Sequence, residues 1–227
     1  SHQNDRTIIR EHMQVWKFGG TSVGKPERMK SIRQLITEDG QPKIVVLSAL
    51  SGSTNTLLSI SESLNVGNPT EAKAKSTELR AHYDQFLTEL YSTPSGLGQG
   101  QAIVAKEFDF IDSLIATSPY TGKQEKEMVA LGELLSTQIF EAFLKEEGVS
   151  SALLPALDFM VIDEDNEPLL SVIEQKLATV LAPVKDKQIF VTQGFICRNP
   201  AGEVDNLKRG GSDYTASLIG GAIQAEE

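Results

Sequence analysis

The chain has 227 residues, of which 40% are hydrophobic and 23% are charged, as in ordinary globular proteins. This length suits one large α/β domain or two small ones with a sizeable core. The formal net charge of −10 argues against a nucleic-acid partner, and an anionic substrate would need basic residues close to it. The single cysteine excludes an internal disulfide, and with three scattered histidines it argues against a zinc site of cysteine and histidine ligands.

No apolar run is long enough to cross a bilayer, and no signal segment opens the chain. We therefore expect a soluble, cytoplasmic protein with no membrane partner. Residues 1–12 are polar and without pattern before Met13, and we interpret them as a vector-derived leader or a disordered native extension.

From Met13 onward the predicted elements alternate between strands and helices. In chain order, we expect a strand (13–18), a helix (26–36), a strand (43–49), a helix (57–64), three helices between 70 and 144, a short strand (151–156), a helix (169–181), a strand (188–196) and a final helix from 213. Loops at 92–100 and 117–123 should divide the three-helix block. The alternation predicts an α/β fold with a mainly parallel sheet that helices cover on both faces.

The stretch KFGGTSVGKP, residues 17–26, looks like a phosphate-binding P-loop with one residue wrong, because Pro26 stands where a P-loop has Ser or Thr. A tight turn between strand and helix would explain a lone Gly-Gly pair. However, Lys17 ends a strand that looks buried, and two glycines and two hydroxyl side chains follow it. A fixed ammonium beside close backbone N–H groups suits a transferring phosphoryl group, so Lys17 is the candidate and Lys25 a helix-surface residue.

Two further loops follow strands in the same way, ALSGSTN at 49–55 and NLKRGGSD at 206–213. Read singly, Thr54, Asn55 and Asp213 would only cap the helices that follow. Sites in parallel α/β sheets lie beyond the carboxyl ends of the strands. We therefore expect the loops 19–22, 49–55 and 209–213 to converge there on a shared anionic site.

Glu133 stands on an apolar helical face with Val129, Phe140 and Leu144, whereas Glu127, Glu141 and Lys145 share a face that we expect to be solvated. A carboxylate on an apolar face is costly unless it is paired or hydrogen-bonded. It is either part of a buried structural salt bridge or a group that binds a substrate ammonium.

An amino-acid pocket would combine such a carboxylate with a guanidinium. Arg209 suits a substrate carboxylate, and Glu133 or Asp213 suits a substrate amine. We expect Glu133 to lie within a few ångströms of Arg209 or Asp213.

Five stretches, KFGGTSVG, VVLSALSGSTN, GELLST, VTQGFI and RGGSDYTA, occur in this order and together resemble the signatures of aspartate kinases, in the amino-acid kinase family. The resemblance runs from Met13 to the C-terminus and is weakest over 65–123. It implies a three-layer αβα sandwich, the amino-acid kinase fold. It also implies transfer of the γ-phosphoryl group of ATP to the β-carboxylate of L-aspartate, giving 4-phospho-L-aspartate for lysine, threonine, methionine and isoleucine biosynthesis.

Position by position, the resemblance implies roles for the residues of all three loops. It makes Lys17 and Asp213 catalytic. For the phosphate path it implies Lys17, Gly19, Gly20, Thr21, Ser22, Gly210 and Gly211. For aspartate it implies Ser48, Thr54, Glu133, Arg209, Ser212 and Asp213. The family also implies Mg²⁺ held mainly through the phosphates of ATP, and a homo-oligomer in a full-length parent.

The sequence departs from the family at two places. Lys208 stands where the family usually has glycine, a difference to which we assign little weight. Aspartate kinases continue past the position of Glu227 with a nucleotide-binding segment, usually followed by regulatory ACT domains. We therefore expect residues 13–227 to be the aspartate-binding, N-terminal part of a catalytic domain, truncated at its C-terminus and inactive alone.

Two alternatives remain open at this point. One is another kinase of the same family, such as acetylglutamate or glutamate 5-kinase, although Glu133 and RGGSD argue against it. The other is a non-catalytic amino-acid-binding module.

Overall fold

The computed structural model describes residues 13–208 and 210–225. Its main sheet has four strands in the order β1 (Gln14–Phe18), β2 (Lys43–Leu47), β4 (Ile189–Gln193) and β3 (Ser151–Leu154), and each neighbouring pair is parallel. The two central strands, KIVVL and IFVTQ, are buried along their whole length, which is why both read as apolar runs.

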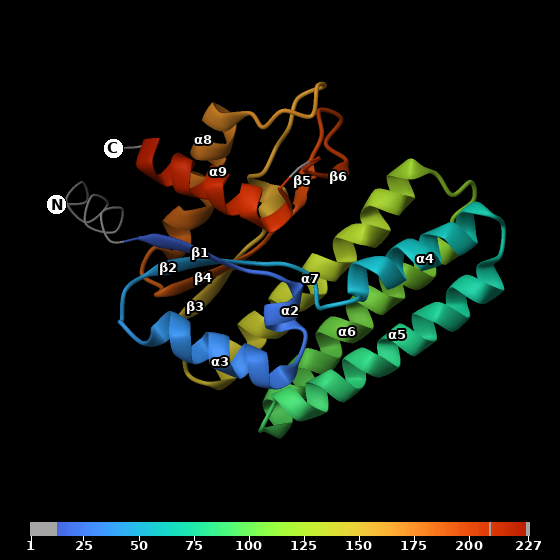
Figure 1. The fold of residues 1–227 in the computed structure, drawn as a ribbon, viewed down its shortest axis with the longest axis horizontal. Helices are drawn as coiled ribbons and strands as arrows, with labels where there is room; N and C mark the ends of the chain where they lie inside the picture. The colour runs from blue at the N-terminus through green and yellow to red at the C-terminus, as the bar shows by residue number, and fades with distance from the viewer. Residues whose placement is uncertain (1–12, 209, 226–227) are drawn as a thin grey trace.

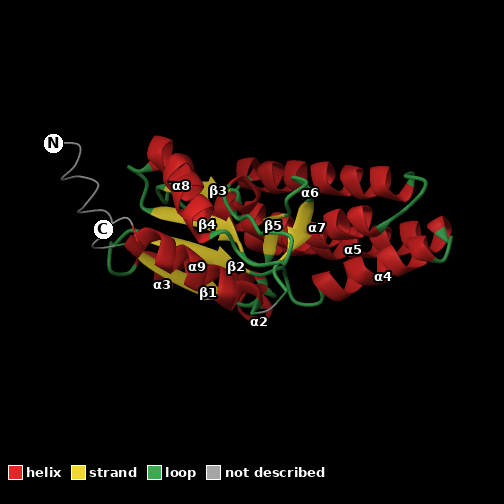
Figure 2. Cartoon of the chain, turned by 90° about the horizontal axis from the view of Figure 1, so that it is seen from above, coloured by secondary structure: helices red, strands yellow, loops and turns green. Residues whose placement is uncertain are grey.

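Helices cover both faces of this sheet, so the predicted α/β sandwich of three layers is confirmed (Figures 1 and 2). Val45 and Val191 face a core that includes α3 (Pro26–Thr37) and α7 (Gly122–Glu146). Ile44 and Phe190 face the opposite core, beneath α8 (Leu170–Leu181) and α9 (Gly211–Ala225). Alternate side chains of one strand thus reach opposite cores.

A helical bundle extends from one side of the sheet (Figure 1). It consists of α4 (Ser53–Asn65), α5 (Pro69–Leu90), α6 (Pro94–Ile115) and α7, which pack against one another. Helix α7 also packs against β2, β3 and β4, so it joins the bundle to the sheet.

The break predicted at 92–100 is much shorter than expected, because α6 already begins at Pro94. The Glu146 carboxylate accepts hydrogen bonds from the backbone N–H groups of Ser92 (3.0 Å) and Thr93 (3.3 Å), and the Thr93 hydroxyl accepts one from the N–H of Gly96 (3.0 Å). These caps start the helix despite its three early glycines.

The strand predicted over 188–196 is two strands that belong to different sheets. β4 ends at Gln193, and β5 (Ile196–Arg198) pairs antiparallel with β6 (Val204–Asn206). The chain turns at Phe195, whose φ of 72° is unusual for a residue with a side chain. Its N–H donates to the Thr215 hydroxyl (2.9 Å), which helps to hold the turn.

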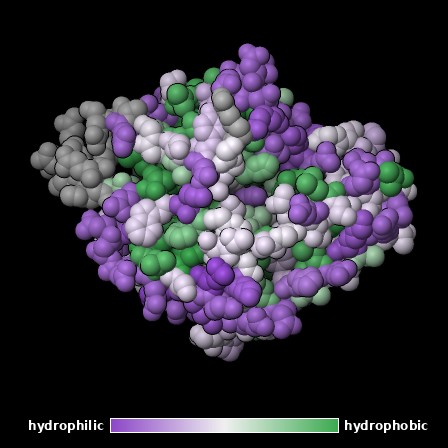
Figure 3. All heavy atoms as spheres, in the orientation of Figure 1, coloured by the Kyte–Doolittle hydropathy of each residue, from purple (hydrophilic) through white to green (hydrophobic). Residues whose placement is uncertain are grey.

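The strand that carries Lys17 was predicted to be buried, and this prediction is wrong. Within 13–208 and 210–225, β1 pairs only with β2, and its residues are exposed or half-buried. Figure 3 shows apolar surface near β1 and α3, whereas the surface of the bundle is mainly hydrophilic. No helix in the described residues has the length and apolarity needed to span a membrane.

The remaining elements are short. They are α2 (Gly20–Val23) and two 3₁₀ turns, η1 (Ala156–Asp158) and η2 (Ala182–Val184).

Candidate functional site

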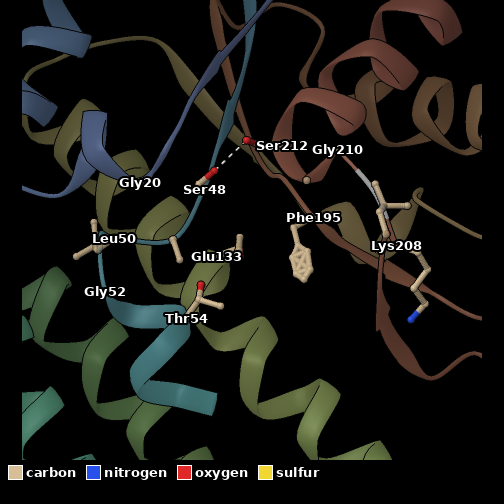
Figure 4. A pocket seen from close by; sticks show the side chains of 13 residues that line it. Gly20, Ser48, Leu50, Gly52, Thr54, Glu133, Phe195, Lys208, Gly210 and Ser212 are labelled. Atoms are coloured by element: carbon tan, nitrogen blue, oxygen red, sulfur yellow. Dashed lines mark hydrogen bonds between the residues drawn. The ribbon is translucent and has the colours of Figure 1, made fainter. Parts of the chain in front are cut away.

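The three predicted loops meet at the carboxyl edge of the sheet, around a cavity of about 580 Å³ (Figure 4). The first loop contributes Gly20, the second contributes residues 48–50, 52 and 54, and the third contributes residues 210–212. Glu133 from α7, Phe195, Leu207 and Lys208 complete the lining.

Direct contacts join the loops to one another. Lys17 Nζ at the end of β1 lies 2.6 Å from Asp213 Oδ1 in the first turn of α9. The Ser48 hydroxyl donates to the Ser212 hydroxyl (2.9 Å), as the dashed line in Figure 4 shows. The predicted convergence of the three loops is therefore confirmed. For the first two loops it follows from the parallel pairing of β1 with β2, whereas the hairpin of β5 and β6 leads the chain from β4 to the third loop.

Glu133 is the buried ionisable residue of the cavity wall. Its side chain is only 3% exposed, and Oε2 has no hydrogen-bond partner in the described residues. Burial raises its pKa from 4.5 to about 8, although hydrogen bonds from its own backbone and from the backbone of Ala49 act in the opposite direction. A buried acid with a free oxygen is a receptor for a donor supplied by a ligand.

Two arrangements were predicted for Glu133, a buried structural salt bridge and a position close to Arg209 or Asp213. No ion pair to Glu133 is found among the described residues, so the buried structural salt bridge is absent from that part of the chain. Arg209 lies outside the described residues. Asp213 is engaged by Lys17, and Ser212 rather than Asp213 lines the cavity with Glu133.

Helix α7 comes unusually close to the second loop, and a glycine makes this possible. A Cβ on Gly132 would lie 2.8 Å from the Cβ of Ala49, a distance that real side chains do not tolerate. The close approach brings the neighbouring carboxylate of Glu133 to the same cavity as the second loop.

The phosphate side of the predicted site is more open. The side chains of Lys17 and Asp213 are 45% and 69% exposed. Gly19 precedes α2, and Thr21 and Ser22 lie within it, outside the cavity wall. Their role toward phosphate stays a prediction. Lys25 is exposed at the start of α3, as expected of a helix-surface residue.

The predicted helix caps are wrong at two loops. The N-cap of α4 is Gly52, with φ of 85°, so Thr54 lies inside the helix and lines the cavity. Asp213 is the third residue of α9, which begins at Gly211. Gly210 and Gly211 have positive φ values of 71° and 45°, which explains the glycine pair before this helix.

The solvated face predicted for α7 is also wrong at Glu141. This residue is buried, accepts a hydrogen bond from the Ser151 hydroxyl (3.0 Å) and pairs with Lys145 (3.3 Å). The bundle and the sheet pack around α7 and bury Glu141, whereas Glu127 is half-buried and Lys145 is exposed.

Sequence reasoning missed Phe195 and set Lys208 aside, although both line the cavity. The Lys208 ammonium binds Asp205 (2.9 Å), which also pairs with Lys126 (3.2 Å), and in Figure 4 it points away from Glu133. The strand pattern hid Phe195, because a left-handed turn leaves no signal when glycine is absent.

The arrangement suits a small molecule that carries a cationic group. The buried carboxylate of Glu133 favours a cationic donor, and the hydroxyls of Ser48, Thr54 and Ser212 surround the same hollow. Lys17 is not part of the cavity wall, and its ammonium is paired with Asp213. No group of three or more metal-ligating side chains was found in residues 13–208 and 210–225.

Comparison with known proteins agrees with this geometry. A family model described as the amino acid kinase family matches residues 12–227. Lysine-sensitive aspartokinase 3 of Escherichia coli is 30% identical over 220 residues, which are 93% of this chain and 46% of that protein. Chloroplastic aspartokinase 1 of Arabidopsis thaliana is 30% identical over 223 residues, 94% of this chain and 38% of that protein.

A solved structure has the same fold. The crystal structure of E. coli aspartokinase III in complex with aspartate and ADP is 29% identical, with a TM-score of 0.81. The match covers 93% of this chain and 47% of that one. The chain therefore spans about half the length of these bacterial relatives.

Proposed function

Because the chain belongs to the amino acid kinase family, as its motifs predicted, we propose that it forms the aspartate-binding part of an ATP-dependent aspartate kinase. The reaction would transfer the γ-phosphoryl group of ATP to the β-carboxylate of L-aspartate. The observation that carries this proposal is the buried carboxylate of Glu133, which lines the cavity where the three loops meet and has one oxygen without a partner among residues 13–208 and 210–225.

Glu133 would bind the α-ammonium of aspartate. A cationic donor in the cavity supplies the missing hydrogen bond of Oε2 and drives the carboxyl into its ionised form. The hydroxyls of Ser48, Thr54 and Ser212 would orient the substrate carboxylates. Arg209, outside the described residues, remains the candidate for the α-carboxylate.

Lys17 would act at the other end of the substrate, where negative charge develops during phosphoryl transfer. Its ammonium contacts Asp213 at the carboxyl edge of the sheet, the edge at which Gly20 packs against the second loop. The backbone of residues 19–22 and of Gly210 and Gly211 would line the phosphate path.

When bound, ATP supplies the phosphoryl group, and Mg²⁺ carried on its phosphates offsets their charge. Among the described residues, Asp213 is the carboxylate in contact with Lys17, and a single carboxylate near the phosphates suits Mg²⁺ that the nucleotide carries.

Calorimetric titration of the chain with three acids tests the proposal. L-Aspartate should bind, L-glutamate should bind more weakly, and N-acetyl-L-aspartate should bind weakest, since acetylation removes the ammonium that Glu133 requires. Equal affinity for aspartate and its N-acetyl derivative would exclude the proposed role of Glu133 and would favour an acetylated substrate.

A matched pair of variants locates the effect. Glu133→Gln should weaken aspartate binding roughly 10- to 150-fold, because a charge-assisted contact contributes about 1.5–3 kcal/mol. Glu127→Gln, on the same helix but outside the cavity wall, should leave the affinity unchanged.

Three statements stay predictions: the isolated chain is inactive, the full-length parent is a homo-oligomer, and the protein is cytoplasmic. The sequence predicts no turnover by the isolated chain, which a coupled ADP-release assay with aspartate, ATP and magnesium tests. One plant relative is named as chloroplastic, so the compartment differs within the family.

A further inference from the structure

Two of the sequence motifs contain buried polar residues to which the proposed chemistry gives no role. GELLST contributes Ser136 and Thr137 on α7, and VTQGFI contributes Gln193 at the end of β4. Ser136 and Thr137 have no exposed surface, and Gln193 is 1% exposed. Most polar groups buried so completely have hydrogen-bond partners, because burial without a partner is costly.

Gln193 and Thr137 form a chain of hydrogen bonds that ends on the backbone of Glu133. The Gln193 amide donates from Nε2 to the Thr137 hydroxyl (2.9 Å), which in turn donates to the carbonyl of Glu133 (2.7 Å). The amide oxygen of Gln193 accepts a hydrogen bond from the N–H of Ala156 (2.8 Å). The amide is therefore held at both ends and cannot rotate without losing a partner.

Ser136 ties the same helical turn to the loop after β2. Its hydroxyl donates to the carbonyl of Ser48 (2.8 Å), and the Ser48 hydroxyl continues to Ser212 on α9. With the close approach at Gly132, two adjacent turns of α7 are attached to β4 on one side and to the second loop on the other.

This attachment matters because the Glu133 side chain is weakly held by its own contacts. One carboxylate oxygen has no partner in the described residues, and the side chain's hydrogen bonds come from its own backbone and from the backbone of Ala49. The position of the carboxylate therefore depends on the position of the backbone that carries it. A slight slide or rotation of α7 would carry the carboxylate away from the cavity. Binding side chains must lie within about half an ångström of the position that the ligand requires.

We propose that Gln193 and Thr137 are positioning residues, whose hydrogen-bond chain fixes the turn of α7 that holds Glu133 toward the ligand cavity. Neither residue lines the cavity, so each acts through Glu133. The proposal rests on the proposed function, in which Glu133 binds the ammonium of the amino acid.

The test compares three substitutions at two buried threonines, Thr137 on α7 and Thr192 on β4. Thr137→Val keeps the shape of the side chain but removes the hydroxyl, and Thr137→Ser keeps the hydroxyl. Thr192→Val is the matched control, because Thr192 is the adjacent residue on β4, is equally buried and has a hydroxyl with no partner in the described part of the chain. Its side chain faces the opposite side of the sheet from Gln193.

Two readouts separate positioning from a purely structural role. In calorimetry, Thr137→Val should weaken L-aspartate binding about tenfold, or about 1.4 kcal/mol, while Thr137→Ser and Thr192→Val stay within about twofold. In a ¹³C titration of the carboxyl group without ligand, Thr137→Val should lower the pKa of Glu133 from about 8 toward 4.5, since a displaced carboxyl group gains water.

Gln193→Met breaks the same chain from its other end and must change both readouts in the same direction. Unchanged affinity and unchanged pKa of Glu133 in Thr137→Val and Gln193→Met would overturn the proposal, even if thermal unfolding shows that both variants are less stable. If Glu133→Gln itself left aspartate affinity intact, the proposed function would fail instead. The effect of Gln193 and Thr137 on ligand binding would then fail with it. The carboxyl titration would then still report whether the chain places Glu133.

Discussion

Replacing Glu133 by glutamine should stabilise the ligand-free protein at alkaline pH while it weakens amino-acid binding. The folded chain holds this carboxyl group in a cavity where burial raises its pKa from 4.5 to about 8. Glutamine has nearly the same shape and never ionises. The substitution therefore removes the free-energy cost of placing a negative charge in the cavity.

The magnitude and its sign follow from proton linkage. Because the pKa of Glu133 is higher in the folded state, its protonation contributes stability that is complete below pH 4.5 and is lost as the pH rises through 8. At about 1.36 kcal/mol per pH unit, the wild-type protein should lose roughly 3–4 kcal/mol through this group between pH 5 and pH 8. The glutamine variant should not show this loss.

Urea unfolding at pH 5, 6.5 and 8, followed by circular dichroism, measures this difference. The free energy of unfolding of Glu133→Gln, relative to wild type, should increase steadily across the series. Glu127→Gln should show no such trend, since its side chain is partly exposed. A constant difference between Glu133→Gln and wild type at all three pH values would refute the buried, uncompensated carboxyl group.

Three further predictions follow from the site. At pH 7, aspartate binding should release nearly one proton as Glu133 ionises, measurable by calorimetry in buffers of different ionisation enthalpy. In a chimera that joins this chain to the remaining part of E. coli aspartokinase 3, Lys17→Ala should lower kcat about 10²- to 10³-fold, and Lys25→Ala should leave it nearly unchanged; the reverse order would restore the P-loop interpretation. Gly132→Ala should destabilise the fold by about 1–3 kcal/mol through overpacking, whereas Gly98→Ala, whose new Cβ meets no atom within 4 Å, should not.

Glu133 is thus expected to lower the stability of the ligand-free protein while it strengthens amino-acid binding. One oxygen of this carboxyl group has no partner in the part of the chain that the structure describes, so its ionisation in the absence of a ligand is expected to destabilise the fold.

Local pattern was sufficient for the layers of the fold and for the meeting of the first two loops. The apolar runs of β2 and β4 predicted strands buried on both faces, and parallel strands place their carboxyl ends at one edge. The helical spacing of Glu133 from Phe140 likewise placed its carboxylate on a buried face, because periodicity reports which side chains share a face.

Tertiary structure decided the features that depend on neighbours distant in the chain. Glu141 has a polar sequence pattern, yet it is buried because the bundle and the sheet enclose α7. The strand predicted through Phe195 is broken because α9 supplies the Thr215 hydroxyl that holds a left-handed turn. The chain from Gln193 through Thr137 to Glu133 joins β4 to a helix more than fifty residues earlier. Such hydrogen bonds exist only once the layers have packed, and sequence periodicity records the faces of one element but not the partners that cover them.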